Sequence, residues 1–290
     1  MSIIGLWNRL TPSAFNYETQ QTRGFPNNHM TIQNSTIKDS NPREQRHWPL
    51  SGAVNVRDVG GYQTQDGRQT RWCVLLRADS LHRLSDTDQA ELRAAGLHTV
   101  IDLRYEQETK QAPDVFASVS DVHYYNVELM PGSVSGGVVS NAVRLQPPTN
   151  IGDVYKMLVD HCQSEIRQVI AIVADESDGA VLVHCTLGKD RTGVIVALLL
   201  SAVGVPDEII VADYALTGEY IEPLLPALRE QARQSGRDMT IYEQMIITDA
   251  MNMTEFLQYM RIKYGATDEY LRTIGITDAQ LTALRARLTN

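Results

Sequence analysis

Residues 180–204, AVLVHCTLGKDRTGVIVALLLSAVG, constrain the fold more than any other part of the chain. The stretch 180–185 is apolar at successive positions, which is typical of a strand buried on both faces of a parallel sheet. The stretch 192–204 is apolar all round and is expected to be a buried helix. Between them lies a short loop with a thiol, a lysine, an aspartate and an arginine. This order predicts an α/β fold with its chemistry at the carboxyl edge of the sheet.

The remaining pattern supports the same fold class. Strands are expected at 70–78, 98–103 and 121–127, and helices at 85–96, 151–162 and 164–177. The helix at 85–96 has clear boundaries, because Ser85 suits an N-cap and Gly96 a stop. After residue 205 every segment has helical periodicity, including a stretch at 240–265. We therefore expect an α/β sheet flanked by helices, with an all-helical C-terminal extension.

The chain divides into an arm and a globular domain. Residues 1–47 are polar, rich in Asn, Gln, Ser and Thr, and are expected to form an extended or poorly ordered arm. The alternative is that IIGLW at 3–7 anchors a docked strand or helix. Residues 48–290 are expected to form one domain, in which 218–252 could cover the active site as a helical lid. The Gly/Ser/Pro loop at 130–149 has a length typical of functional loops.

Composition excludes several classes of protein. The chain is 43% hydrophobic and 21% charged with a net charge of −9, so broad attraction to nucleic acid is not expected. Three scattered cysteines form no CxxC pair, which argues against a disulfide framework and favours a reducing compartment. The longest apolar run, 194–200, is too short to span a bilayer, and the N-terminal apolar stretch is too short for a signal peptide. We expect a cytoplasmic protein without stable membrane insertion; export by a route that leaves no mark in the sequence stays open.

The loop at 186–191 has the features of an oxyanion site. Backbone N–H groups of a tight loop before a helix can converge on one point, where the helix dipole adds positive charge. The guanidinium of Arg191 matches two phosphate oxygens. The same field stabilises a thiolate at Cys185, and Thr192 can place a hydroxyl near the sulfur. A thiolate in such a cradle predicts two-step hydrolysis of a phosphomonoester through a phosphocysteine. The cradle donors are expected to be the main-chain N–H groups of Thr186, Leu187, Gly188, Lys189, Asp190 and Arg191.

HCTLGKDRTG at 184–193 resembles the HCxxGKDRTG loop of an atypical bacterial and fungal branch of the protein tyrosine phosphatases. Four further segments resemble elements of that branch: NVRDVGGY (55–62), RADSL (77–81), VIDLR (100–104) and YGATDEYLRTIGIT (264–277). The resemblance covers roughly residues 50–288. It implies a tyrosine-phosphatase-like fold, no metal or organic cofactor, and a phosphorylated protein or phosphoinositide as substrate, since the branch includes dual- and triple-specificity enzymes.

The leaving oxygen of the substrate needs a proton donor. The commonest tyrosine phosphatases use an aspartate after Trp-Pro, but here Trp48 and Pro49 are followed by Leu50. The resemblance gives the role of general acid and base to Asp190. A rival is Asp153, which lies 32 residues before Cys185 and could instead be a charge in the first turn of a helix.

A second rival, Asp102, could instead orient Arg104 or the loop. Cleavage of a simple phosphate ester does not require a second cation such as Lys189 beside the loop. Lys189 could bind a second phosphate, which the resemblance links to phosphoinositides. It could also be a solvated lysine, or a partner that keeps Asp190 ionised.

The residues around the loop have expected roles too. His184 is adjacent to Cys185, and neighbouring residues seldom ligate one metal, so His184 is expected to hold the loop by hydrogen bonds. Arg57 and Asp58 are expected either beside the substrate or as exposed or paired residues at a strand end. Cys73 is expected in mid-strand.

Together these features predict a cysteine-dependent phosphatase for phosphotyrosine, with phosphoserine, phosphothreonine and phosphoinositides as secondary substrates. One alternative is a phosphatase whose main substrates are phosphoinositides. A sulfur transferase of the rhodanese type is another, since it also sets one cysteine in an anion-binding loop but needs no acid at Asp190. A non-catalytic phosphate-binding module would keep Arg191 and could dispense with Cys185.

Overall fold

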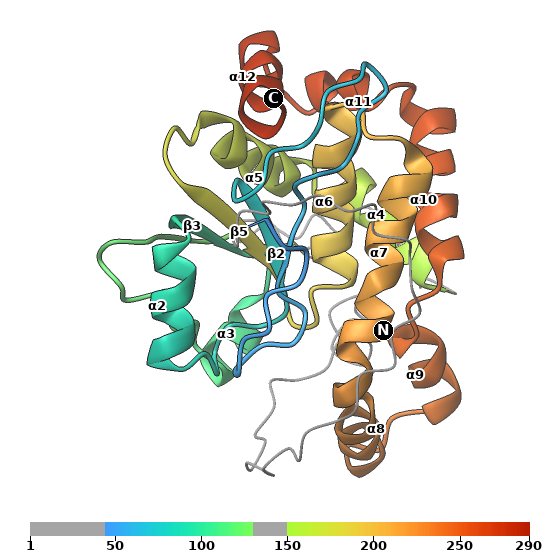
Figure 1. Ribbon diagram of the computed structural model, residues 1–290. Helices are drawn as coiled ribbons and strands as arrows, with labels where there is room; N and C mark the ends of the chain where they lie inside the picture. The colour runs from blue at the N-terminus through green and yellow to red at the C-terminus, as the bar shows by residue number, and fades with distance from the viewer. Residues whose placement is uncertain (1–43, 130–149) are drawn as a thin grey trace, which may run out of the picture.

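The computed structural model describes residues 44–129 and 150–290, in which a five-stranded sheet lies between layers of helices (Figure 1). The strand order is β1-β2-β5-β3-β4. The strands are β1 (Arg57–Asp58), β2 (Leu75–Ala78), β3 (Leu97–Asp102), β4 (His123–Asn126) and β5 (Ala180–His184). β1 pairs antiparallel with β2, and every other pairing is parallel. The predicted α/β fold class is confirmed. The carboxyl ends of β2, β3 and β5 meet at one edge, where Ala78, Asp102 and His184 share a register.

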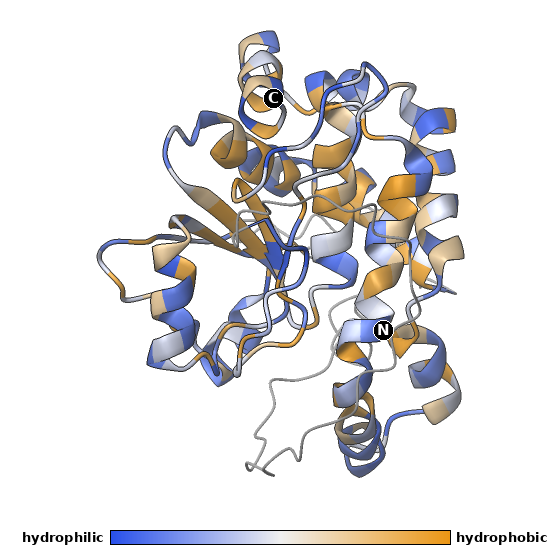
Figure 2. Ribbon diagram, in the orientation of Figure 1, coloured by the Kyte–Doolittle hydropathy of each residue, from blue (hydrophilic) through white to orange (hydrophobic). Residues whose placement is uncertain are grey.

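Both faces of the sheet are buried, which explains the continuous apolar run of β5. Val181 and Val183 pack on one face, whereas Ala180 and Leu182 pack on the other. The first face is covered by α4 (Ile151–His161), α5 (Gln163–Asp175) and α6 (Asp190–Ala202). The second face is covered in part by α2 (Asp86–Ala94). In Figure 2 the hydrophobic colour gathers on the central strands and on α6.

Helix α6 carries Arg191 into the core. It begins at Asp190, two residues earlier than expected, and every residue from Arg191 to Leu200 is buried. The prediction of a buried helix is therefore confirmed. Its N-terminus meets the carboxyl edge of the sheet, where the loop that joins it to β5 lies.

The chain after residue 205 is helical, as expected. Its elements are α7 (Asp207–Ile221), the 3-10 turn η1 (Glu222–Leu224), α8 (Leu225–Gln234), α9 (Met239–Ile246), α10 (Ala250–Tyr264), α11 (Thr267–Thr273) and α12 (Asp278–Leu288). The C-terminal end of α7 packs with α8 and α9 around a small apolar cluster that also contains Leu187 of the loop. This unit lies below the main body in Figure 1.

Two element predictions were wrong. The stretch 240–265 is two helices, because the side chain of Asp249 accepts a hydrogen bond from the N–H of Met251 and caps a new helix. The strand expected at 70–78 is only β2, and Cys73 lies in a turn with φ of 57° instead of in mid-strand. Its N–H donates to Asp58 Oδ2 at 2.7 Å, which holds it out of the sheet. The helix α3 (Glu106–Gln111) was not expected.

The predicted arm and long loop lie mostly outside the described residues, which exclude 1–43 and 130–149. The last residues of the arm pack on the body: the Arg46 guanidinium lies 3.8 Å from the centroid of the Tyr62 ring, and His47 stacks on Tyr220. In the described parts of the chain, every helix is too short or too polar to cross a membrane.

Candidate active site

The loop between β5 and α6 turns its carbonyl groups outward. The carbonyls of residues 185–188 accept hydrogen bonds, in that order, from His184 Nδ1 (3.3 Å), Ser80 N (3.1 Å), Asn55 Nδ2 (2.9 Å) and Arg77 Nη2 (2.7 Å). A trans peptide points its N–H opposite to its carbonyl, so the N–H groups of 186–189 face the inside of the loop. Within the described residues these N–H groups have no backbone acceptor. Four such N–H groups at the N-terminus of α6 have the arrangement that suits an oxyanion, and we call this loop the cradle.

Gly188 makes the tight approach of the loop to β2 feasible. Its φ is +64°, a conformation that other residues rarely adopt. A Cβ at this position would lie 2.4 Å from the carbonyl oxygen of Ala78. The hydrogen bond from Arg77 to the Gly188 carbonyl also needs this approach. Only glycine fits both the backbone conformation and the available space.

Arg191 lies in the core with its guanidinium held by a carboxylate that the sequence did not reveal. Nη1 donates to Glu108 Oε2 at 2.6 Å and Nη2 donates to Glu108 Oε1 at 2.9 Å, a bidentate arrangement that fixes the guanidinium plane. The hydroxyl of Thr186 donates to the same carboxylate. Burial lowers the pKa of Arg191, but the electrostatic effect of Glu108 and Cys185 raises it by a larger amount. The net pKa lies above the ordinary value for arginine.

Glu108 could have been found from its place in the chain. It belongs to α3, which directly follows the segment at the carboxyl end of β3. Because parallel strands end at one edge of a sheet, an acidic residue just after β3 comes close to the loop after β5.

Cys185, directly before the loop, and Thr192, directly after Arg191, are both buried. Cys185 is 3% exposed and packs with the main core. The hydroxyl of Thr192 is buried and, in the part of the chain that the structure describes, has no hydrogen-bond partner. A buried hydroxyl without a partner is costly in a protein core, so a ligand or the thiolate is its natural partner. Its expected role beside the sulfur stays a prediction.

Asp190 differs from its neighbours in the loop because its side chain is 26% exposed. Its Oδ1 accepts a hydrogen bond of 2.7 Å from the hydroxyl of Tyr155 on α4. That hydroxyl also lies 2.7 Å from the hydroxyl of Tyr214 on α7. Burial, together with Asp190 and Tyr214, raises the pKa of Tyr155 well above its usual range, so it remains a neutral donor. Sequence reasoning missed Tyr155, because only packing brings α4 to the loop.

Lys189 is buried, which corrects the interpretation of a solvated loop lysine. Its Nζ donates to the carbonyls of Met245, at 2.5 Å, and Ile247, at 3.2 Å, in the segment between α9 and α10. The same Nζ lies 3.6 Å from Asp190 Oδ1. This distance agrees with the interpretation that Lys189 is the ion-pair partner of Asp190. Lys189 and Leu187 together attach the loop to the unit of α7, α8 and α9.

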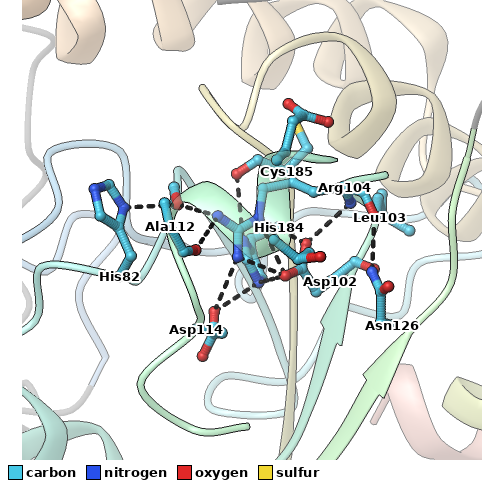
Figure 3. Close-up of polar contacts among 12 residues, drawn as sticks. His82, Asp102, Leu103, Arg104, Ala112, Asp114, Asn126, His184 and Cys185 are labelled. Carbon is cyan, nitrogen blue, oxygen red and sulfur yellow. Dashed lines mark hydrogen bonds and ion pairs between the residues drawn. The ribbon is translucent and has the colours of Figure 1, made fainter. Parts of the chain in front are cut away.

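A buried set of four charged residues lies behind the cradle (Figure 3). Arg104 donates from Nε and Nη2 to Asp102, at 2.9 and 2.6 Å, so Asp102 orients Arg104, one of its two expected roles. His184 Nε2 lies 3.1 Å from Asp114 Oδ2 and 3.7 Å from Asp102 Oδ2. Burial lowers the pKa of His184, but the two carboxylates raise it by a larger amount. The net pKa lies above the ordinary value for histidine.

Asp102 is badly placed to protonate a substrate. Its side chain is buried. Burial raises the pKa of Asp102, but His184 and Arg104 lower it by a larger amount, so the net pKa lies below the ordinary value. Asp153 lies in the first turn of α4, 3.3 Å from Lys156 Nζ. This position agrees with the second interpretation of Asp153, a charge in the first turn of a helix.

Among the described residues, the hydrogen bonds of the Arg57 and Asp58 side chains go to partners outside the loop. Arg57 donates to the carbonyl of Asp213 at 2.7 Å and to the hydroxyl of Thr217 at 2.9 Å, both on α7. Asp58 accepts hydrogen bonds from the N–H groups of Gly60 and Cys73, which closes the turn after β1. Both residues are paired and buried because they join β1 to its surroundings.

Comparison with known proteins gives consistent matches. The family model described as "Tyrosine phosphatase family" matches residues 48–290. A tyrosine-protein phosphatase of Nostoc commune is 32% identical over 228 residues, which are 73% of each chain. The triple specificity protein phosphatase PtpB of Mycobacterium tuberculosis is 28% identical over 277 residues, 82% of this chain and 98% of that protein. The crystal structure of P. aeruginosa TpbA overlaps with 61% of this chain and 89% of its own, at 17% identity and a TM-score of 0.30, too low to support any conclusion.

Proposed function

We propose, from the premise that this chain belongs to the tyrosine phosphatase family, that it hydrolyses phosphotyrosine through a covalent intermediate on Cys185. Protein tyrosine phosphatase activity follows from the membership itself. The covalent intermediate, the residues that carry the reaction and the range of substrates are what we propose beyond it.

The observation that carries the proposal is the outward orientation of four successive loop carbonyls, at residues 185–188. It leaves four N–H groups that face the inside of the loop directly after Cys185. Such donors are fixed before the substrate arrives, so they stabilise the negative charge of the transition state without reorganisation.

In the first proposed step, the sulfur of Cys185 attacks the phosphorus of the ester. An S–P bond forms as the P–O bond to tyrosine breaks, and the leaving oxygen takes a proton from Asp190. Arg191 and the inward N–H groups of the loop bind the phosphate oxygens. Glu108 keeps the guanidinium of Arg191 in one plane during this step.

In the second step, water attacks the phosphorus of the phosphocysteine. The carboxylate of Asp190 accepts the proton of the water, the S–P bond breaks, and inorganic phosphate leaves while the thiolate is regenerated. The side chain of Asp190 is 26% exposed, so it is accessible to solvent, as both proposed proton transfers require. Thr192 supports the departing thiolate with its buried hydroxyl.

The proposed substrates are phosphotyrosine first, with phosphoserine, phosphothreonine and phosphoinositides as secondary classes. The name of the relative PtpB, a triple specificity phosphatase, supports this breadth. Use of Lys189 for a second phosphate requires its ammonium to leave the carbonyls of Met245 and Ile247. Residues 218–252 therefore form the proposed lid, and phosphoinositide hydrolysis depends on its movement. A cytoplasmic location belongs to the same proposal.

Trapping the intermediate tests the proposal. Acid quenching during turnover of a ³²P-labelled phosphotyrosine peptide should leave label on the protein, and Cys185→Ser should abolish both the label and the turnover. Cys73→Ser is the matched control, because Cys73 lies in a turn away from the loop. Label or turnover near the unsubstituted level in Cys185→Ser would refute the nucleophile.

Two further assays separate the remaining alternatives. A sulfur transferase of the rhodanese type would transfer sulfur to cyanide and would leave p-nitrophenyl phosphate intact. A panel of phosphopeptides and phosphoinositides, compared by kcat/KM, identifies the main substrate class. A higher kcat/KM for phosphoinositides would reverse the proposed order of substrates.

A further inference from the structure

A second group of ligand-type side chains lies at the opposite end of β3 from the cradle. His98 near the start of β3, His123 at the start of β4 and Glu176 just after α5 converge there. One ring nitrogen of each histidine and one carboxylate oxygen all lie within 4.8 Å of one another. Parallel pairing of Thr99 with His123 brings the two histidines together on neighbouring strands.

The carboxylate of Glu176 is held in one orientation. Oε2 accepts a hydrogen bond of 2.5 Å from the hydroxyl of Thr99, and Oε1 accepts one of 3.1 Å from the N–H of Asp178. The carbonyl of Glu176 accepts a hydrogen bond of 2.7 Å from Arg287.

The two imidazoles are close to the separation that a shared ion needs. His98 Nδ1 lies 3.1 Å from Glu176 Oε2, and the ring centroids of His98 and His123 are 4.6 Å apart. Ligands that bind Zn²⁺ at about 2.0–2.2 Å in a tetrahedron are roughly 3.4 Å from each other. The side chain of His98 is 33% exposed and His123 is exposed, so both rings have room for the remaining rotation.

We propose that His98, His123 and Glu176 form a binding site for a divalent transition metal ion of the Zn²⁺ class. Two imidazoles and one carboxylate are a donor set that suits this class. A cavity of about 740 Å³, lined in part by His123 and Glu176, adjoins the site, so water or a small ligand can complete the coordination from there. Thr99 acts as the hydrogen-bond partner that orients the carboxylate.

The effect of the ion follows from its position. It joins the edge strand β4 to β3 and to the end of α5, so it stabilises the fold at an edge that otherwise faces solvent. The proposal is independent of the phosphatase mechanism, because His98 and the catalytic end of β3 at Asp102 are separated by about 13 Å of strand.

The test uses full-length Cys185→Ser protein without a histidine tag, so that the proposed nucleophile cannot take up the metal. Titration with Zn²⁺ in a calorimeter should show one equivalent bound. At about 100-fold excess over the Kd, the Tm should rise on the order of 5 °C. With Co²⁺ in place of Zn²⁺, visible d–d absorption should report nitrogen and oxygen coordination.

His123→Ala in the same background should lower the affinity for Zn²⁺ about 100-fold or more and abolish the Tm rise. His161→Ala is the matched control, an exposed histidine at the end of α4. Thr99→Val, which keeps the size of the side chain, should weaken binding roughly tenfold, as loss of an orienting hydrogen bond does. Unchanged Tm before metal addition verifies that each variant folds. The absence of Zn²⁺ binding, or equal affinities with and without His123, would overturn the proposal.

Discussion

At the scale of single residues, Asp190 and Asp153 differ in their surroundings rather than in their chemistry. Asp190 begins α6 beside the cradle and accepts a hydrogen bond from Tyr155, whereas Asp153 pairs with Lys156 on the same helix. An acid that protonates the leaving oxygen matters most when that oxygen is strongly basic. The basicity of the leaving group therefore distinguishes a proton donor from a residue that only shapes the site.

Asp190→Asn should reduce kcat for a phosphotyrosine peptide about 100-fold, the usual scale of general acid catalysis. The loss should be much smaller for p-nitrophenyl phosphate, whose leaving group is less basic. Steady-state kinetics with the two substrates measures the contrast. Asp153→Asn serves as the control and should change neither rate appreciably; a large, substrate-dependent loss in that variant instead would transfer the role to Asp153.

Gly188 offers a second test at this scale. Gly188→Ala should reduce kcat/KM at least 100-fold, because its Cβ would lie 2.4 Å from the carbonyl oxygen of Ala78 and push the loop off β2. Gly236 is the matched control: its φ is +67°, close to the +64° of Gly188, but nothing lies within 4 Å of an added Cβ. Gly236→Ala should therefore lower stability only by the cost of a left-handed backbone, about 1–2 kcal/mol, without loss of activity. Full activity in Gly188→Ala would show that the loop does not need this approach.

At the scale of elements, the junction between α9 and α10 is held in place by a residue that is distant in the chain. Residues 247–249 interrupt the helical pattern, and the carbonyls of Met245 and Ile247 accept hydrogen bonds from Lys189 in the loop. The junction is held to the cradle by one buried ammonium and by the packing of Leu187 with α8 and α9.

Lys189→Met should loosen this junction, since a buried carbonyl that loses its donor costs about 1–3 kcal/mol. Limited proteolysis should then cleave within 235–249 several times faster than in the unsubstituted protein, with cleavage sites mapped by mass spectrometry. Lys156→Met, a substitution of the same type in a partly exposed ion pair on α4, should leave the rate unchanged. Equal cleavage rates for Lys189→Met and the unsubstituted protein would mean that packing alone holds the lid.

The same junction shows where prediction from the sequence stopped. The elements β5 and α6 were predicted well, because their apolar patterns are local and complete. The late start of β2 depends on Asp58, which is distant in the chain and holds Cys73 in a turn. The segment between α9 and α10 is likewise held by a distant residue, Lys189. Within the site, Cys185 and Arg191 share one loop and a recognisable spacing. Glu108 reaches the site only because parallel strands end at a common edge.

Dispersed residues were the hardest to predict. Tyr155 reaches Asp190 from another helix, and no periodic pattern marks it. The expectation of no metal rested on the family resemblance and on the adjacent positions of His184 and Cys185. His98, His123 and Glu176 come from three separate elements, so no motif could signal the site that we propose for them.

At the scale of the whole molecule, the charged residues behind the cradle link the loop after β5 to the sheet. Arg104 and His184 offset the charges of Asp102 and Asp114 in a region without solvent contact. A buried charge that loses its partner is strongly destabilising, so the protonation of His184 affects the stability of the entire fold.

The pKa of His184 is higher in the folded protein than its ordinary value of 6.5, because the two carboxylates outweigh burial. Between these two pKa values the folded state binds more protons than the unfolded state, so stability falls as the pH rises. The contribution of His184 is fully present below pH 6.5 and is lost as the pH rises through the folded pKa. His184→Gln, which cannot be charged, should lower the free energy of unfolding by on the order of 3 kcal/mol at pH 6. Urea unfolding from pH 6 to 9 should show this difference shrinking steadily, whereas the difference for His161→Gln stays near zero. A His184→Gln difference that is constant or grows with pH would mean that His184 is neutral in the folded protein.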